Sequence, residues 1–196
     1  MGNALLWLAA YVIGSLPSQG LGTAFPKLDP SPTPGHPKLL PTEFYENRFI
    51  VTPVTTRGRK LRLFTDSAGA LLLVSEVATE LNLPITAGKP PTAPWPAFRP
   101  NAFVPAAASG FRLMSRKETD DVFTPEKGID GMLGQQWFGG RVWTFDYRRK
   151  KLYWRAPGDL PKHPVEHEVK LGFRKDSKGA RENNFATIFI TVDGEG

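Results

Sequence analysis

Short apolar runs of strand-forming residues, separated by turn residues, dominate residues 46 to 156. Residues 48–56 are rich in Val, Ile, Thr and Phe, which favour strands. A turn at residues 57–59 leads into Lys60–Thr65, where apolar and polar positions alternate, and the two runs together predict a hairpin. Leu71–Val74 is short and wholly apolar, which predicts a buried strand.

The rest of this region predicts further strands and one or two short helices. Ser75 is placed as the N-cap of a short helix that ends before Pro84. Phe111–Met114 predicts a strand and Gln135–Phe138 a helical turn. Residues 142–147 and 151–154 flank a basic turn and predict a closing hairpin. The fold class is therefore mainly β.

The N-terminal stretch differs from the rest in polarity. Ala4–Ile13 is almost wholly apolar, and small residues follow at Gly22–Ala24, which predicts a signal peptide over residues 1–24 and a periplasmic or secreted protein. The alternatives are a buried strand or helix of the mature fold and, less favoured, an uncleaved anchor. The apolar run is too short for a membrane span, so none is expected after signal removal. Six prolines between residues 25 and 41 predict an extended linker over residues 25–45.

The C-terminal stretch carries a hint of repetition. After a connector at residues 157–182, Phe185–Glu195 resembles Phe49–Arg59 in its order of Phe, strand formers and a turn with Gly. Residues 183–196 are therefore predicted to begin a second unit that stops short of its own acidic loop. Two unrelated hairpin starts are the alternative.

The amino-acid composition excludes or disfavours several kinds of functional site. The 196 residues include 19 Gly and 19 Pro, which suit strands joined by turns. There is no cysteine, which excludes disulfides, thiol nucleophiles and thiolate metal sites. The net charge of +6 is dispersed except at residues 148–151, where a solvated turn is favoured over a nucleic-acid surface because no recognised nucleic-acid motif accompanies it. Pro161 and Pro164 accompany His163 and His167, which disfavours the helix that a metal site there would need.

Acid–base chemistry by Asp66 is the remaining candidate. This residue ends an apolar strand and is followed by Ser67 and small residues, which let a tight turn present the carboxylate. One aspartate is a poor match for proton transfer at neutral pH. Two neighbouring aspartates share one proton and supply an acid and a base together. The alternative is an Asp that caps a turn in a β-rich binding module.

Two short motifs stand far apart in the sequence, Phe64-Thr65-Asp66-Ser67 and Asp130-Gly131-Met132-Leu133-Gly134. These motifs and their separation along the chain resemble those of the retropepsin-like aspartic proteases, in particular exported bacterial members with two units per chain. The resemblance implies a closed barrel, a flap within residues 87–111 and a ψ-shaped loop arrangement. For residues 87–105, a loop wrapped on the core is the alternative to a mobile cover. The resemblance makes Asp66 catalytic and gives the supporting roles to Ser67, Ala68, Gly69, Ala70, Met132, Leu133 and Gly134. Ser67 would lock two such loops together, and Ala68 stands where the family has Gly, so either Ala68 occupies that position or Gly69 serves instead.

The resemblance further implies an endopeptidase that acts on peptides or proteins without metal or cofactor. Because the chain holds one such Asp motif, the second aspartate is expected from a homodimer partner or from a second lobe. The rival interpretation is a catalytically inactive exported β-domain that binds peptides in the same groove.

Overall fold

The computed structural model describes residues 31–102, 104–107, 109–122, 128–159, 172–179 and 181–187. The chain divides into two compact units, residues 1–159 and residues 160–196. The expected signal peptide, the two histidines of the connector and the end of the expected second unit lie outside the described residues. In the described part, no helix has the length and apolar character needed to cross a membrane.

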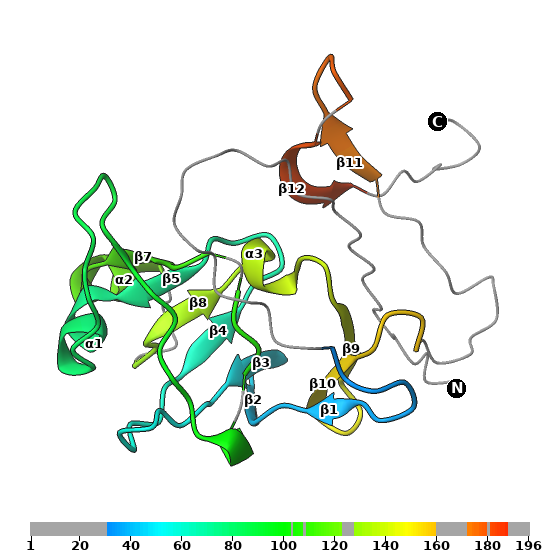
Figure 1. Ribbon diagram of the computed structural model, residues 1–196, viewed down its shortest axis with the longest axis horizontal. Coiled ribbons are helices and arrows are strands. Elements are labelled where there is room, and N and C mark those ends of the chain that lie inside the picture. Colours follow the sequence, from blue (N-terminus) through cyan, green and yellow to red (C-terminus); the bar gives the residue numbers. More distant parts are fainter. Residues whose placement is uncertain are drawn as a thin grey trace. The chain divides into compact units, whose positions relative to one another are not determined.

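The larger unit contains a seven-stranded sheet in the order β2-β3-β4-β8-β5-β7-β6 (Figure 1). Its strands are β2 (Thr42–Tyr45), β3 (Arg48–Val51), β4 (Leu63–Thr65), β5 (Leu72–Val74), β6 (Thr92–Ala93), β7 (Phe111–Met114) and β8 (Gly131–Leu133). The strands are short and β2 and β6 form the two edges, so this sheet is open. The mainly β class is confirmed, whereas the expected closure into a barrel is not found in the described residues.

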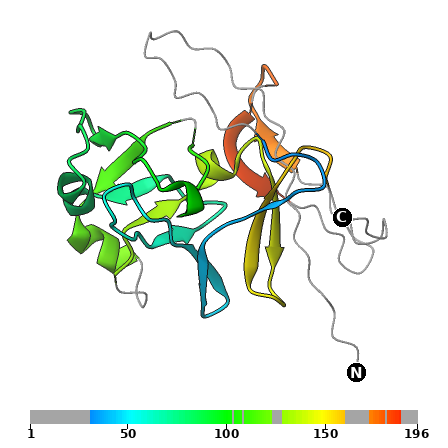
Figure 2. The same ribbon diagram turned by 60° about the horizontal axis from the view of Figure 1, so that its bottom comes forward.

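A second sheet of three strands has the order β1-β10-β9, with β1 (Lys38–Leu39), β9 (Val142–Asp146) and β10 (Lys151–Arg155). The predicted closing hairpin is confirmed, with Lys151 opposite Asp146 and Arg155 opposite Val142. Figures 1 and 2 both show this hairpin at one end of the larger sheet, with two helices at the opposite end.

Those helices are α1 (Ser75–Glu80) and α2 (Arg116–Val122), and α3 (Gln135–Phe138) follows β8. A 3-10 helix, η1, covers Pro100–Ala102. The helix α1 begins at Ser75 itself and has no side-chain cap, so the expected N-cap role of Ser75 is wrong. The helix α2 was not predicted, although Ser115 and Glu118 form a capping box in which each bonds the other's backbone N–H.

Part of the expected linker belongs to the folded unit. Both β1 and β2 lie within residues 25–45, and β2 pairs with β3 from Thr42 opposite Val51 to Tyr45 opposite Arg48. The stretch after Pro41 carries no proline and is rich in strand formers. Glu46 and Asn47, with φ of 45° and 62°, make the tight turn that such a hairpin needs.

The smaller unit contains one described hairpin. Its strands are β11 (Gly172–Lys175) and β12 (Arg181–Thr187), which pair antiparallel. The strand β11 lies in the expected connector, and β12 includes Phe185, where the expected repeat begins.

Alternation along the strands separates two apolar clusters on the two faces of the larger sheet. In β3, Phe49 and Val51 join the large cluster, whereas Ile50 joins the small one. The large cluster also holds three buried tryptophans, Trp137, Trp143 and Trp154. The small cluster consists of Ile50, Leu72, Ile129 and Met132, with the partly buried Phe64, Ala70 and Met114 packed against it. The face with the small cluster carries fewer buried apolar side chains than the other face.

Candidate active site

The strand β8 lies between β4 and β5 and pairs with both (Figure 1). It runs parallel to β4, with Thr65 opposite Leu133, and antiparallel to β5, with Leu72 opposite Met132. The connection from β4 to β5, residues 66–71, must therefore cross the end of β8. This is the ψ-shaped arrangement that the motif resemblance implies, and it brings together the two motifs that are far apart in the sequence.

Asp66 stands at the start of this crossing loop. Its backbone N–H donates to the Leu133 carbonyl at 3.1 Å, which extends the β4–β8 pairing by one step. The carboxylate Oδ1 accepts the Ala68 N–H at 2.9 Å, and the Gly69 N–H donates to the Asp66 carbonyl at 3.0 Å. Asp66 therefore begins a tight turn in which both its side chain and its backbone carbonyl accept hydrogen bonds from the residues that follow. The residue is half-buried, and in the described part of the chain no ion pair joins it to a cation.

Gln135 fastens the loop from the other side, at the start of α3. Its backbone N–H donates to the Gly69 carbonyl at 3.0 Å, and its side-chain Nε2 donates to the Ala68 carbonyl at 3.1 Å. Sequence reasoning did not assign Gln135 this role. Its position directly after the motif that ends in Gly134 is the signal that could have found it.

Gly134 and Gly69 allow the loop and β8 to approach closely. A Cβ on Gly134 would lie 2.2 Å from the Gly69 carbonyl oxygen and 2.3 Å from that of Ala70. A Cβ on Gly69 would lie 2.7 Å from Met132 Sδ and 2.9 Å from Asp66 Oδ2. Ala68 is exposed, so Gly69 occupies the crowded position in this loop.

The expected residues around Asp66 are thus gathered at one place. Leu133 is fully buried, and Met132 is nearly so, with its sulfur beside Asp66 and Gly69. Ala70 packs against the small cluster. Ser67 is exposed, and its hydroxyl makes no hydrogen bond within the described residues.

Asp130 has a different role, which sequence reasoning did not assign. This residue is 4% exposed, and its Oδ2 accepts the Arg62 backbone N–H at 2.9 Å. Its Oδ1 accepts from Arg59 at 3.0 Å and from Arg116 at 3.2 Å. Arg59 also pairs with Glu80 of α1, and Arg116 also donates to the Ile129 carbonyl. Asp130 therefore ties β8 to the 57–60 turn and to α2.

The segment expected to hold a flap is packed on the core over much of its described length. Trp95 stacks on Phe111 with ring centroids 4.7 Å apart, and Phe98 meets Trp95 edge-on. The Thr56 N–H donates to the Ala97 carbonyl and the Arg99 N–H to that of Val54. These contacts favour a loop wrapped on the core for residues 95–99.

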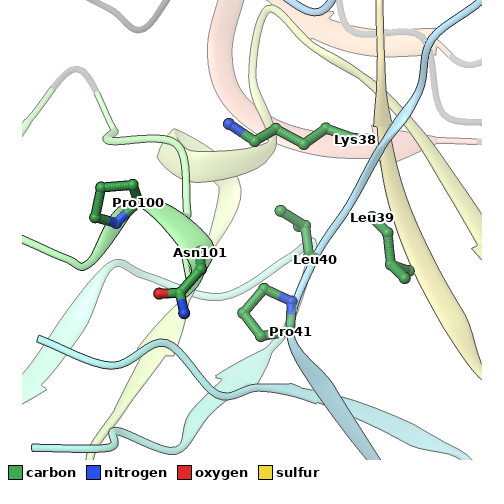
Figure 3. Close-up of a pocket in the computed structure, with 6 residues that line it drawn as sticks. All are labelled: Lys38, Leu39, Leu40, Pro41, Pro100 and Asn101. Carbon is green, nitrogen blue, oxygen red and sulfur yellow. The ribbon is translucent and has the colours of Figure 1, made fainter. Parts of the chain in front are cut away.

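The hollows in the described part of the larger unit include two that differ in their relation to the Asp66 loop. One, of about 210 Å³, lies where Pro100 and Asn101 of η1 face Leu40 and Pro41 (Figure 3). None of its lining residues belongs to the Asp66 loop. The other, of about 330 Å³, is lined by Leu71, Thr92, Ser109, Gly110, Arg112 and Gln136, and Leu71 is the last residue of the Asp66 loop.

Comparison of the chain with protein-family models, with curated proteins and with solved structures found no match in any of the three. No group of three or more His, Asp or Glu side chains that could hold a metal ion was found among the described residues.

Proposed function

We propose that this chain supplies one half of an aspartic-type endopeptidase site, with Asp66 as its catalytic acid. The observation that carries the proposal is the crossing loop between β4 and β5, which presents a half-exposed carboxylate beside the end of β8. Backbone groups and Gln135 hold this loop, so the carboxylate is positioned without a cation to neutralise it. The retropepsin-like fold belongs to the same proposal.

The chemistry requires a second aspartate close to the first. In the pair, the ionised carboxylate takes a proton from water as the water oxygen attacks the peptide carbonyl carbon. The protonated partner gives its proton to the carbonyl oxygen. Collapse of this intermediate breaks the C–N bond, and the amine leaves with a proton from the pair. We infer that the second aspartate comes from another copy of the chain or from a second lobe.

The apolar face beside Asp66 supports a peptide as the substrate. Phe64, Ala70 and Met114 are partly exposed on that face, next to the nearly buried Met132. Such a surface can receive apolar side chains of an extended peptide. The apolar stretch at Ala4–Ile13 supports action after export.

Proteolysis by the purified full chain tests the proposal. Wild type is assayed at acidic pH on a protein substrate with and without pepstatin, over a series of chain concentrations. Asp66→Asn removes the acid, and Asp121→Asn alters an exposed aspartate of α2 as the matched control. We expect pepstatin-sensitive cleavage that rises more steeply than in proportion to concentration, is lost in Asp66→Asn and persists in Asp121→Asn. Cleavage that survives Asp66→Asn contradicts the role of Asp66. If no form cleaves at any pH or concentration, the inactive peptide-binding domain becomes the better account.

A further inference from the structure

The strand registers place six side chains in one row across the larger sheet. Ile50 is opposite Phe64, Phe64 opposite Met132, and Met132 opposite Leu72. Leu72 is in turn opposite Arg112, and Arg112 is opposite Thr92. Directly opposed residues of paired strands point to the same face of a sheet. Arg112 and Thr92 therefore continue the apolar row that passes beside Asp66.

Arg112 changes the character of this row from apolar to cationic. Met132 and Leu72 belong to the small apolar cluster and Phe64 packs against it, whereas Arg112 is exposed. Three other arginines of the unit, Arg59, Arg116 and Arg149, each pair with a buried aspartate. No ion pair joins Arg112 to an acid among the described residues. The charge of Arg112 is thus available to a ligand.

The hollow of about 330 Å³ lies at this end of the row. Its lining residues include Arg112, which carries a guanidinium, Thr92 and Ser109, which carry hydroxyl groups, and Gln136, which carries an amide. The lining contains no acidic residue. All of these polar groups can donate hydrogen bonds, and a guanidinium matches the two oxygens of a carboxylate in a bidentate way. The chemistry of the hollow therefore fits a carboxylate.

We propose that the hollow at Arg112 is a subsite for a carboxylate of the peptide that lies along the apolar row, either an acidic side chain or a free C-terminus. The subsite rests on the proposed function for its peptide ligand. The row spans two strand spacings from Met132 to Arg112, roughly 10 Å. An extended chain covers about 3.3 Å per residue, so the carboxylate lies about three residues from the peptide bond held at Asp66.

Peptide binding to the full chain carrying Asp66→Asn tests the subsite, because this variant removes the proposed catalytic acid and leaves the subsite intact. The probes are fluorescent decapeptides with a central Leu-Phe pair and either Glu or Gln three residues away on one side or the other. Each is made with a free and with an amidated C-terminus. Fluorescence anisotropy gives the dissociation constants at low and at high salt.

We expect the Glu peptides to bind about tenfold more tightly than their Gln counterparts at low salt, with the preference reduced at high salt. Arg112→Gln should abolish the preference, and Arg112→Glu should reverse it, so that the Gln peptides bind more tightly than the Glu peptides. Arg57→Gln, which alters an exposed arginine of the 57–59 turn, should leave it unchanged. A preference that follows the free C-terminus instead of Glu identifies the terminal carboxylate as the ligand group.

Equal affinity for all peptides, no measurable binding, or a preference that persists in Arg112→Gln would overturn the subsite. The outcome is separable from that of the proposed function. Wild-type cleavage that depends on Asp66 but ignores peptide charge removes the subsite alone. A charge preference that depends on Arg112 in a chain that never cleaves removes the catalytic proposal alone.

Discussion

Two aspartates lie at opposite ends of the parallel strands β4 and β8, and they are held in opposite ways. Asp130, before β8, is buried and bound by Arg59, Arg116 and a backbone N–H. Asp66, after β4, is half-exposed, and within the described residues one hydrogen bond reaches its carboxylate, from the neighbouring Ala68 N–H. The acid with strong partners serves the fold, whereas the acid with weak partners is the one available for chemistry.

The supports of the two ends differ in kind as well as in strength. At the Asp66 end, backbone-to-backbone bonds and the close approach of Gly134 position the loop. At the Asp130 end, the side-chain charges of Arg59 and Arg116, which come from two separate parts of the chain, meet on one carboxylate. A loop positioned by its main chain can keep its carboxylate free of cations. Substitutions at the two ends should therefore lower the free energy of unfolding for different physical reasons.

The largest loss of stability is expected from Gly134→Ala, which alters the Asp66 end, where backbone contacts position the loop. The added Cβ would lie 2.2 Å from a backbone oxygen of the Asp66 loop, so the loop or β8 must move. We expect a loss of about 3 kcal/mol or more in the free energy of unfolding. Gly69→Ala is the graded control, because its Cβ meets the flexible Met132 side chain and should cost less. Urea unfolding measures both, and equal losses would show that the backbone approach does not limit this end.

Asp130→Asn alters the Asp130 end, where ion pairs hold the carboxylate. Asp66→Asn is the matched substitution at the other end. Loss of the buried carboxylate charge leaves Arg59 and Arg116 without their shared partner, and their partial exposure moderates the cost to about 2–3 kcal/mol. Asp66→Asn keeps an acceptor for the Ala68 N–H, so a change within about 0.5 kcal/mol is expected. Denaturant unfolding of the two variants compares them directly. Similar losses would remove the distinction between the two aspartates.

The smallest effect concerns pH and a third aspartate, Asp146, at the end of β9. Burial by itself would raise the pKa of Asp146, but hydrogen bonds from the Arg149 N–H and guanidinium and the arginine charge hold that pKa below its ordinary value. A lowered folded-state pKa contributes stability above about pH 4, which is lost as the pH falls through the folded-state value. Asp146→Asn should therefore lose less stability than wild type between about pH 7 and about pH 3. Urea midpoints of both proteins at the two pH values measure this. If the stability difference between wild type and Asp146→Asn is the same at both pH values, the prediction is contradicted.

Local patterns in the sequence were enough for the elements that build the Asp66 end. The hairpin that leads into β4, the strand β5 and the motif of β8 each follow from a few adjacent residues. The prediction that the two motifs meet followed from their resemblance to a known arrangement. The structure places β8 beside β4 and β5 accordingly, with Gly69 in the crowded position and Ala68 exposed.

Other features depended on residues too far apart for any local pattern. Arg59 and Asp130 are separated by 71 positions, so the local sequence around either residue does not predict that the two side chains pair. The strands β1 and β2 were hidden because the surrounding prolines made the whole stretch resemble a linker. The seven-stranded sheet is open because its edge strands β2 and β6 do not pair with each other. The sequence of a single strand does not predict this.

The sequence by itself determined where strands and turns form, because side-chain shape and the period of apolar positions act over a few residues. It also determined that an aspartate ends one of those strands in a tight turn. Tertiary structure alone decided which aspartate is enclosed and which is presented. That choice depends on the local dielectric and on charges brought from distant parts of the chain, and both exist only after the strands have paired.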